Sequence, residues 1–465
     1  MQIPILNGTY TSEAPDIRVA YPRNMQPVPV QSGISNGYLR PAEGIVSAGS
    51  APGMDRGGIN WNGRHYRVMG TSLVEVQSDG AVMVLGDVGA GGYVTLDYSF
   101  DYLAIASGGN LFYWDGASLQ QVTDPDLGFV LDVIWIDGYF MTTDGEFLVV
   151  TELNDPFSVL PTKYGSSEID PDPVEALLKL KNEAYALNRY TIEVFDNVGG
   201  SGFPFQRIDG AQIEKGTVGT HTCCVFVDAI AFMGSGRNEA ISVYLAASGT
   251  AVRIATREIE LQLKNYTESE LTQAKIEDRI DNGHQLLYIH LPDKTLVYDA
   301  AASAAVGQPV WFILSSSLVE SIYRGRNLVW VYDKWWVGDT SAMAVGYLSD
   351  SVSEHWGKMV AWEFNTGIVY NESNGAIFHE LELVCLTGRN ALNTDSTIWT
   401  QYSLDGESWS MPKSIKTGTI GNRKKRLIWL FQGSMENFRI QRFRGTSDAQ
   451  IAPVRLEARL EALAW

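Results

Sequence analysis

Cysteine is scarce in this chain of 465 residues: there are three, of which Cys223 and Cys224 are adjacent and Cys385 is remote. Such a set cannot build the framework of several disulfide bonds found in many small secreted proteins, and it fits assembly in a reducing cytoplasm. The first residues, MQIPILNGTY, lack the basic start and the apolar run of a secretory signal. No stretch approaches 18 uninterrupted apolar residues. We therefore expect a soluble protein that is made in the cytoplasm and does not insert into a membrane.

Motifs of enzyme chemistry are also missing. No pair of the six histidines has the i, i+4 spacing of a helical metal motif, and His379–Leu383 lacks the second histidine of a zinc protease. Gly234–Asn238 is rich in glycine but lacks the Gly-Lys-Ser/Thr ending that contacts phosphate, so we expect a turn there. Cys223 and Cys224 have apolar neighbours and no basic ones, which predicts core thiols rather than nucleophiles. The sequence thus predicts no catalytic residue, no metal site and no cofactor.

Basic residues are outnumbered: 54 Asp and Glu face 35 Lys and Arg, which gives a formal net charge of −19. A chain this acidic does not wrap nucleic acid through bulk electrostatics, because tight phosphate binding needs Lys and Arg. The balance reverses in 411–465, where eleven basic residues face four acidic ones. The densest basic run is Arg423, Lys424, Lys425 and Arg426. This run is either a solvated loop or an interface for an acidic partner, and it is the candidate interface of the chain.

Helix signals are few, and most of the chain consists of short runs of β-branched and aromatic residues separated by Gly, Asp and Asn. Strand–turn–strand units start roughly 30 to 60 residues apart, a spacing that includes that of β-propeller blades. The units are Gly63–Gly80, Leu103–Gly116, Leu131–Thr151, Leu177–Asn197, Val225–Ser248, Leu286–Ala300 and Val329–Leu348. These patterns predict an all-β fold with a β-propeller of six or seven irregular blades. A long irregular β-sandwich is the alternative.

Two stretches depart from this pattern. Tyr266–Ile280 is charged and poor in β-branched residues, and Thr267 with Glu270 has the spacing of a capping box. We therefore expect a helical insertion near 266–280, where a repeat fold often carries contacts to a partner. The first 45 residues are rich in proline and predict an extended arm rather than a packed unit.

Beyond about residue 372 the spacing of the predicted strands changes to that of a β-sandwich. The predicted strands are Ile377–Leu386, Thr397–Ser403, Arg426–Phe431, Phe438–Phe443 and Val454–Leu460. The sequence thus predicts three parts: an extended N-terminal arm over 1–45, a β-propeller over 46–372 and a C-terminal β-sandwich-like domain over 373–465.

Two features raise the question of carbohydrate binding. Ser403–Trp409 resembles a shortened Asp box, a structural hairpin of sialidase-like propellers, and predicts a hairpin rather than a glycan site. Five tryptophans between Trp330 and Trp362 would suit stacking on sugars or on single-stranded bases, although core packing and subunit interfaces use tryptophan more often. A glycan-binding or glycan-cleaving propeller is therefore the alternative function. A scaffold propeller of the cellular kind lacks its regular Trp-Asp or kelch signatures here.

Four phrases occur in order along the chain: SNGYLRPAEGI (Ser35–Ile45), KGTVGTHTCCVFVDAIAFMG (Lys215–Gly234), IATREIELQLKNYTESEL (Ile254–Leu271) and HQLLYIHLPDKTLVYDAAAS (His284–Ser303). Together they resemble the packaged-DNA stabilization proteins, also called tail hubs or nozzles, of short-tailed phages (podoviruses). In the first phrase Ala42 and Glu43 stand before Gly44, where the family has a Pro-Gly-type turn. The resemblance covers about 22–348 and weakens toward the C-terminus.

The resemblance implies a structural protein of the virion tail that catalyses no reaction. Six copies would form a ring beneath the dodecameric head-to-tail adaptor. The ring would continue the DNA channel, help to retain packaged DNA, support its ejection and receive a tail needle or plug, with tailspikes or fibres attached nearby. An acidic lumen would keep double-stranded DNA from adhering to the wall. The run Arg423–Arg426 would then face an acidic neighbour such as the adaptor.

Overall fold

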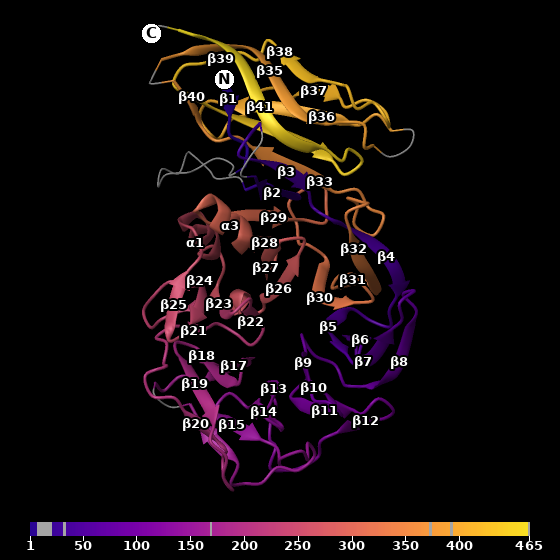
Figure 1. Ribbon diagram of the computed structural model, residues 1–465, viewed down its shortest axis with the longest axis vertical. Coiled ribbons are helices and arrows are strands. Elements are labelled where there is room, and N and C mark those ends of the chain that lie inside the picture. The colour runs from indigo at the N-terminus through magenta and orange to yellow at the C-terminus, as the bar shows by residue number, and fades with distance from the viewer. Residues whose placement is uncertain (7–20, 31–33, 168–169, 372–373, 391–393, 464–465) are drawn as a thin grey trace.

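The computed structural model describes residues 1–6, 21–30, 34–167, 170–371, 374–390 and 394–463. A disc of radiating β-sheets is joined at its rim to a second, smaller β domain (Figure 1). The two domains follow each other along the long axis of the molecule, and both ends of the chain lie in the smaller one (Figure 1). The fold is all-β, as the sequence predicts, and the described residues form seven blades in the disc.

The disc is a β-propeller whose blades are antiparallel sheets. Blade one consists of β5 (Asp55–Trp61), β6 (Arg64–Met69), β7 (Ser72–Val76) and β8 (Val82–Asp87), and blade two of β9 (Thr95–Tyr98), β10 (Leu103–Ser107), β11 (Asn110–Trp114) and β12 (Leu119–Gln121). Blade three consists of β13 (Asp132–Ile136), β14 (Tyr139–Thr143), β15 (Phe147–Val150) and β16 (Tyr164–Ser166), and blade four of β17 (Val174–Leu180), β18 (Glu183–Asn188), β19 (Ile192–Asn197) and β20 (Phe205–Arg207). The first strands of neighbouring blades contact one another and surround the axis.

The remaining blades continue this order. Blade five consists of β21 (Gly216–Thr217), β22 (Cys223–Phe226), β23 (Ala229–Ser235), β24 (Ser242–Ala247) and β25 (Thr250–Arg253). Blade six consists of β26 (Lys275–Asp281), β27 (His284–His290), β28 (Thr295–Asp299) and β29 (Val310–Leu314). Blade seven consists of β30 (Gly325–Val331), β31 (Lys334–Asp339), β32 (Ala344–Ser349) and β4 (Gly44–Ser50). In blade five, β21 and β22 both pair with β23. Because β4 pairs with β32, blade seven contains strands from both the beginning and the end of the propeller.

Tight turns connect the first two strands of several blades. Asn62–Gly63, Asp137–Gly138 and Asn282–Gly283 each have two consecutive positive φ angles, 52° and 74°, 49° and 89°, and 49° and 79°. This geometry belongs to the two-residue hairpin turn that Asn-Gly and Asp-Gly steps favour, because glycine has no Cβ to clash in the left-handed region. The turn residues of the sequence thus fix where the hairpins reverse.

Clusters of buried apolar side chains hold the blades together, one cluster between each pair of neighbours. Between blades one and two, for example, Trp61 and Tyr66 pack in one cluster with Phe112 and Trp114. A blade buries both of its faces only when a neighbour stands on each side, so a single blade has no complete core of its own. The ring is therefore the unit of stability.

Strand β4 closes that ring. It pairs antiparallel with β32, from Ala344 opposite Ser50 to Ser349 opposite Gly44, and forms the outer edge of blade seven. A blade assembled from two distant parts of the chain ties the first blade to the last. The closing strand begins at Gly44, which is slightly before the predicted start of the propeller at residue 46.

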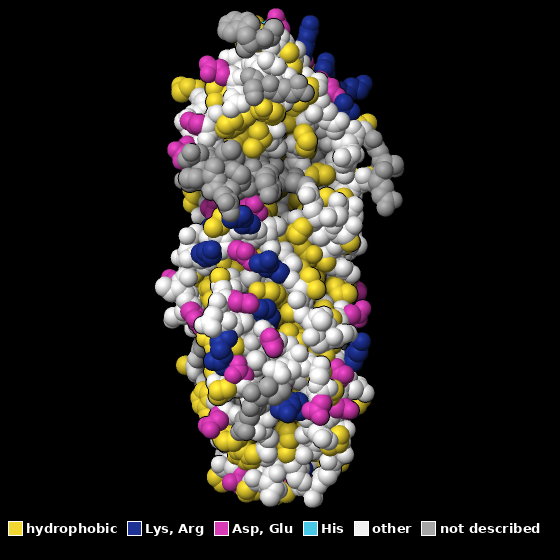
Figure 2. Space-filling model, turned by 90° about the vertical axis from the view of Figure 1, so that its left-hand side faces the viewer, with side chains coloured by type: hydrophobic (Ala, Val, Ile, Leu, Met, Phe, Trp, Pro, Cys, Tyr) yellow, Lys and Arg dark blue, Asp and Glu magenta, His cyan; other side chains and the backbone are white. Residues whose placement is uncertain are grey.

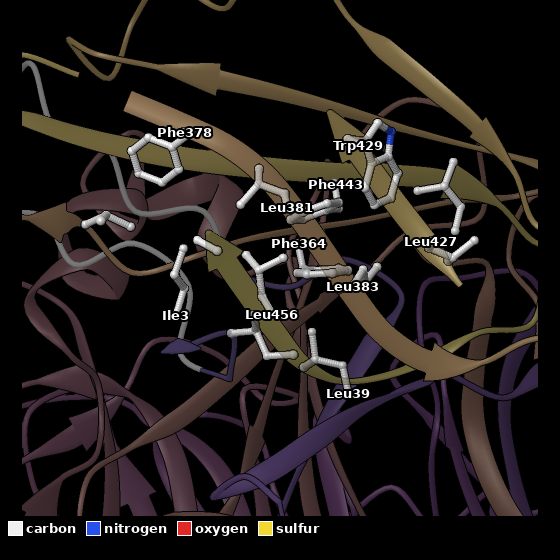
Figure 3. Close-up of a cluster of buried hydrophobic side chains, with 14 of the residues drawn as sticks. Ile3, Leu39, Phe364, Phe378, Leu381, Leu383, Leu427, Trp429, Phe443 and Leu456 are labelled. Carbon is white, nitrogen blue, oxygen red and sulfur yellow. The ribbon is translucent and has the colours of Figure 1, made fainter. Parts of the chain in front are cut away.

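The smaller domain is a β-sandwich, as the sequence predicts. One sheet contains β1 (Gln2–Ile3), β41 (Ala452–Ala462), β35 (Ala376–Leu386) and β38 (Leu427–Leu430), with β39 (Ser434–Met435) paired to β35; the other contains β33 (Ala361–Asn365), β40 (Phe438–Thr446), β36 (Thr397–Ser403) and β37 (Lys413–Lys416), with β34 (Val369–Tyr370) paired to β40. Side chains of both sheets, among them Phe364, Leu381, Trp429 and Phe443, meet in a single core (Figure 3). The five strands predicted after residue 372 are present as β35, β36, β38, β40 and β41.

Two predictions about the ends of the propeller are wrong. Strands β33 and β34 lie before residue 372 but belong to the sandwich, so that domain begins by Ala361 and not at residue 373. The segment 1–45, where described, is not an unpacked arm: β1 pairs with β41, and the hairpin β2 (Met25–Pro29)–β3 (Gly37–Pro41) places Met25 and Leu39 in the sandwich core. A few apolar residues scattered among prolines give no periodic signal, although they are fully buried here.

The helix predicted over Tyr266–Ile280 is wrong in its extent. Helix α1 (Arg257–Leu263) precedes that stretch, and α2 (Glu268–Leu271) is a single turn with the expected capping box of Thr267 and Glu270. The chain then enters β26, which pairs with β27 along its whole length. Strand pairing thus overrides a local helix signal that the charged residues of β26 suggest. A further helix, α3 (Ala300–Val306), lies between β28 and β29.

Candidate functional site

The candidate interface lies in the turn before β38, in the sandwich. Arg423, Lys424 and Arg426 are exposed and Lys425 is half-buried. Thr387 donates a hydrogen bond to the carbonyl of Asn422 at 2.9 Å and so fixes the turn to the end of β35. Lys and Arg side chains gather at the sandwich end of the face shown in Figure 2. The structure therefore places the predicted residues together at the surface.

One member of this run is already engaged within the chain. The guanidinium of Arg426 forms a two-point ion pair with Glu382 on β35, and the hydrogen bonds lower the pKa of that carboxyl. Within the part of the chain that the structure describes, no carboxylate is within ion-pair distance of Arg423, Lys424 or Lys425. These three cations are the ones that remain for a partner.

The propeller carries nearly all of the negative charge. Residues 46–360 contain 40 Asp and Glu against 20 Lys and Arg, whereas 361–465 contain 11 against 12. The extreme is 68–162, which holds 14 Asp and Glu and no Lys, Arg or His. This segment forms the outer strands of blade one and most of blades two and three, which lie at the end of the molecule opposite the sandwich (Figure 1). A charge count in sliding windows of the sequence would have found it.

A buried polar seam joins the blades on either side of the ring closure. Arg67 on β6 is fully buried and donates to both carboxylate oxygens of Asp55, at 2.8 and 2.7 Å. The side chain of Asn327 on β30 donates to the same carboxylate at 2.5 Å, and its carbonyl accepts from Arg67 at 2.9 Å. Blades one and seven are thus linked by a satisfied ion pair that water does not reach.

The seam continues into blade six through Glu277 on β26. Its carboxylate accepts hydrogen bonds from the backbone N–H of Asn327 at 3.1 Å and of Leu328 at 2.8 Å, and contacts His290 Nε2 at 2.7 Å. Burial opposes the charge of Glu277, but the bond from His290 and the nearby Lys275 hold its pKa at about 2. Burial lowers the pKa of His290 to about 4, so the imidazole is neutral at pH 7 and donates to Glu277.

Arg23 and Asn24 join the propeller to the sandwich. Arg23 forms backbone bridges to β29 on one side and to β33 on the other. The buried side chain of Asn24 donates to the carbonyls of Ser315 at 2.9 Å and Ala361 at 2.7 Å, and accepts from the N–H of Ser315 at 2.9 Å. Hydrogen bonding therefore runs without interruption from blade six through the N-terminal segment into the sandwich.

The other sequence features are structural. The turn between β23 and β24 contains Arg237 and Asn238, whereas Gly234 and Ser235 of the predicted turn Gly234–Asn238 belong to β23. Cys223 is buried and Cys224 is partly buried, and burial raises the pKa of both thiols well above the usual value. No group of three or more His, Cys, Asp or Glu in the described ranges has the arrangement to hold a metal ion. No helix among them is long and apolar enough to cross a membrane.

The shortened Asp box is a hairpin turn between β36 and β37. Asp405 accepts from the N–H groups of Glu407 and Ser408 at 2.9 and 2.8 Å, and Ser403 donates to it at 2.9 Å. The hydroxyl of Ser408, which also donates to Asp405, and these three donors lower the pKa of the Asp405 carboxyl. The prediction of a structural hairpin is confirmed.

The tryptophans predicted as a stacking or packing group separate into three environments. Trp336 and Trp362 are buried, Trp335 and Trp356 are half-buried, and Trp330 is 47% exposed. Trp330 stands directly opposite Trp335 across the β30–β31 hairpin, with ring centroids 5.5 Å apart. Packing is therefore their main use.

The structure is thus a seven-bladed β-propeller whose rim is bonded to a β-sandwich. The chain belongs to the bacteriophage P22 Gp10 family: the model of that family's β-propeller matches residues 1–353 and the model of its β-sandwich matches residues 361–461. Tail hub protein gp10 of Salmonella phage P22 is 27% identical over 450 residues, which cover 92% of each chain. The protein is thus a structural hub component of a phage tail, and this relationship implies a non-enzymatic role.

Solved structures resemble the chain only distantly. The computationally designed Ika8 protein has a TM-score of 0.38 at 12% identity and covers 66% of this chain and 100% of its own. The WD40 domain of Neurospora crassa Pan2 has a TM-score of 0.40 at 8% identity, covering 64% and 89%; the N-terminal domain of Nup159 has 0.41 at 8%, covering 69% and 97%. At these scores the likeness supports no functional inference.

Proposed function

We propose that six copies of the chain form a ring that docks beneath the dodecameric head-to-tail adaptor, continues the DNA channel, helps to retain packaged DNA and supports its ejection. The match to the P22 Gp10 family over both domains carries this proposal, because the relative is a tail hub. A tail needle or plug would close the ring, and tailspikes or fibres would attach nearby. The chain would be made in the host cytoplasm and assembled into the virion tail.

The charge of the propeller supports a conduit. With twice as many acidic as basic residues in 46–360, the ring would repel duplex DNA and let it pass without adhering. Retention of the genome would then come from closing the channel with a plug and not from gripping phosphates. Binding of double-stranded DNA to the isolated protein at physiological salt would contradict this part of the proposal.

The basic turn of the sandwich supports docking on an acidic partner. Arg423, Lys424 and Lys425 lie together on a turn that Thr387 anchors, without an internal carboxylate partner among described residues. Opposed charges on two proteins speed association and set its register. In the proposed assembly this turn contacts the adaptor.

The docking contact is tested with the triple variant Arg423→Glu, Lys424→Glu and Lys425→Glu. We expect it to bind the purified adaptor at least about tenfold more weakly than the parent, with a smaller salt dependence, in sedimentation experiments. The matched control reverses three exposed propeller lysines that form no described ion pair, Lys181, Lys264 and Lys358. Equal binding by the parent and the sandwich variant would show that the turn is not the contact.

A further inference from the structure

A notch opens between blades two and three, in the segment that contains no basic residue. Three loops on one face of the propeller form it: the turn after β9, the turn after β13 and the loop after β15. Phe100, Tyr102, Trp135 and Pro156 supply its apolar walls, and Asp101 and Asp155 lie at its edge. Its volume of about 70 Å³ is roughly that of two to three water molecules in the liquid.

The rim of the notch exposes apolar surface that the fold does not require. Phe100 is 86% exposed and Leu153 is 54% exposed. Phe100 meets Trp135 edge to face, with ring centroids 6.4 Å apart, and Leu153 lies over Gly138 of the neighbouring turn. Phe100 and Leu153 thus place exposed apolar surface beside the same small recess.

The charges around the notch are negative and only partly matched. Lys179 of blade four donates to Asp97 at 2.9 and 3.1 Å and lies 5.6 Å from the ring centroid of Trp135. One face of that indole therefore already binds a cation. Asp101 and Asp155 are exposed, and neither has a Lys or Arg partner in the part of the chain that is described.

We propose that this notch between blades two and three receives a Lys or Arg side chain, flanked by an apolar residue, from a segment of another protein. The aliphatic stem would lie against Phe100 and Trp135, and the cationic head would reach Asp101 and Asp155. The negative charge around the notch repels phosphate. This contact is separate from the contacts between copies in the proposed ring, and it does not require that the ring form.

The full-length protein is tested with a capped hexapeptide of alternating leucine and arginine that carries a photoreactive group. Two matched peptides, one of leucine and glutamine and one of glycine and arginine, lack the charge or the apolar side chain. We expect the first peptide to bind at least about fivefold more tightly than either, because both features contribute. Crosslinks should fall on 99–102 and 153–156.

Variants sharpen this test. We expect Asp101→Asn with Asp155→Asn to weaken peptide binding about three- to tenfold, and Phe100→Ala about fivefold, since all three side chains are exposed and the fold does not need them. The controls remove the same features from other blades on the same face: Asp228→Asn with Asp333→Asn, and Ile280→Ala.

Each contrary outcome overturns the proposal. Equal weakening by the control variants, or crosslinks spread over the propeller, would mean adhesion to a negative surface without a site. Absence of binding would remove the site altogether. If the notch variants instead changed self-association measured by light scattering, a second copy would be the occupant and not another protein.

Discussion

The propeller and the sandwich join distant parts of one chain with different kinds of contact. Between blades one and seven, a buried polar seam of Arg67, Asp55 and Asn327 lies beside an apolar cluster. The sandwich joins the two chain ends in an apolar core, where Ile3 packs near Leu456 (Figure 3). A buried polar seam fixes the position of one blade against the other, because each polar group left without a partner would cost stability. An apolar core tolerates small shifts of its side chains.

The two domains also differ in charge. The propeller has 40 acidic and 20 basic residues, and the sandwich has 11 and 12. The propeller is inserted between β1 and β33 of the sandwich, with Asn24 bonded to both domains. An acidic body and a nearly neutral domain with a basic turn are therefore held as one unit. The following changes test how separate the two domains are.

The largest effect is expected for Asp55→Ala. It leaves the guanidinium of Arg67 buried without its carboxylate, which typically costs about 3–5 kcal/mol. Hydrogen exchange followed by mass spectrometry should show faster exchange in blades one and seven and little change in the sandwich. The control Glu75→Gln removes the carboxylate of the exposed Arg64 and should have a small effect. Uniform loss of protection in both domains would contradict the expectation that the two domains unfold separately.

The counterpart in the sandwich is Leu381→Ala. Leu381 is fully buried in the core shown in Figure 3, so truncation should cost about 2–5 kcal/mol through lost burial and the cavity left behind. Denaturant unfolding with hydrogen exchange should now place the loss in the sandwich. The exposed Leu386→Ala on the same strand serves as the control. Protection lost first in the propeller would show that the sandwich does not unfold by itself.

Protonation of buried histidines should weaken the contacts around them in the propeller as the pH falls. Burial lowers the pKa values of His65, His221, His290 and His355, all in the propeller segment of the chain. A histidine with a lowered folded-state pKa stabilises the fold above its unfolded pKa of about 6.5, and this stability is lost as the pH falls. For His290 the loss runs from about pH 6.5 to about 4 and is on the order of 3 kcal/mol.

Unfolding midpoints in denaturant, measured between pH 7 and pH 4 with hydrogen exchange as the local readout, test this expectation. The segments that surround His290 and Glu277 should lose protection as the pH falls while the sandwich keeps it. The variant Glu277→Gln removes the partner of His290 and should change the pH profile of blades six and seven. A propeller whose stability is constant from pH 7 to pH 4 would contradict the expectation that its buried histidines are neutral and stabilise it at pH 7.

The smallest of these effects is expected for Asn24→Ala at the junction. It removes three hydrogen bonds and leaves the carbonyls of Ser315 and Ala361 without that donor, at a cost of about 1–3 kcal/mol. The change should loosen the connection between the two domains more than it lowers their stability. Scattering and limited proteolysis should therefore reveal independent motion of the domains. The control is Asn265→Ala, at an exposed position without a described side-chain hydrogen bond. Unchanged domain orientation would show that other contacts hold the junction.

Much of this fold follows from local patterns in the sequence. Each of the seven predicted strand–turn–strand units lies in a different blade, because hairpins depend on alternation and on turn residues that are adjacent in the chain. The blade count stayed open because blade seven takes its outer strand, β4, from a position about 300 residues earlier in the chain, a pairing that no local pattern records.

The missed elements share that non-local character. β1 is two residues long and gains its partner from β41, and the charged strand β26 is stabilised by β27 and by the seam around Glu277. The basic turn at Arg423–Arg426 could be predicted as a feature because its residues are consecutive. The notch at Phe100 and Asp155 could not, since it combines loops of two blades.

The measurement that tests the central claim most directly is the mass of the chain, alone and mixed with the purified adaptor, by light scattering. A tail hub of the proposed kind should yield a complex that holds six copies of the chain on one dodecameric adaptor. A chain that keeps the mass of a monomer and leaves the mass of the adaptor unchanged would contradict the account.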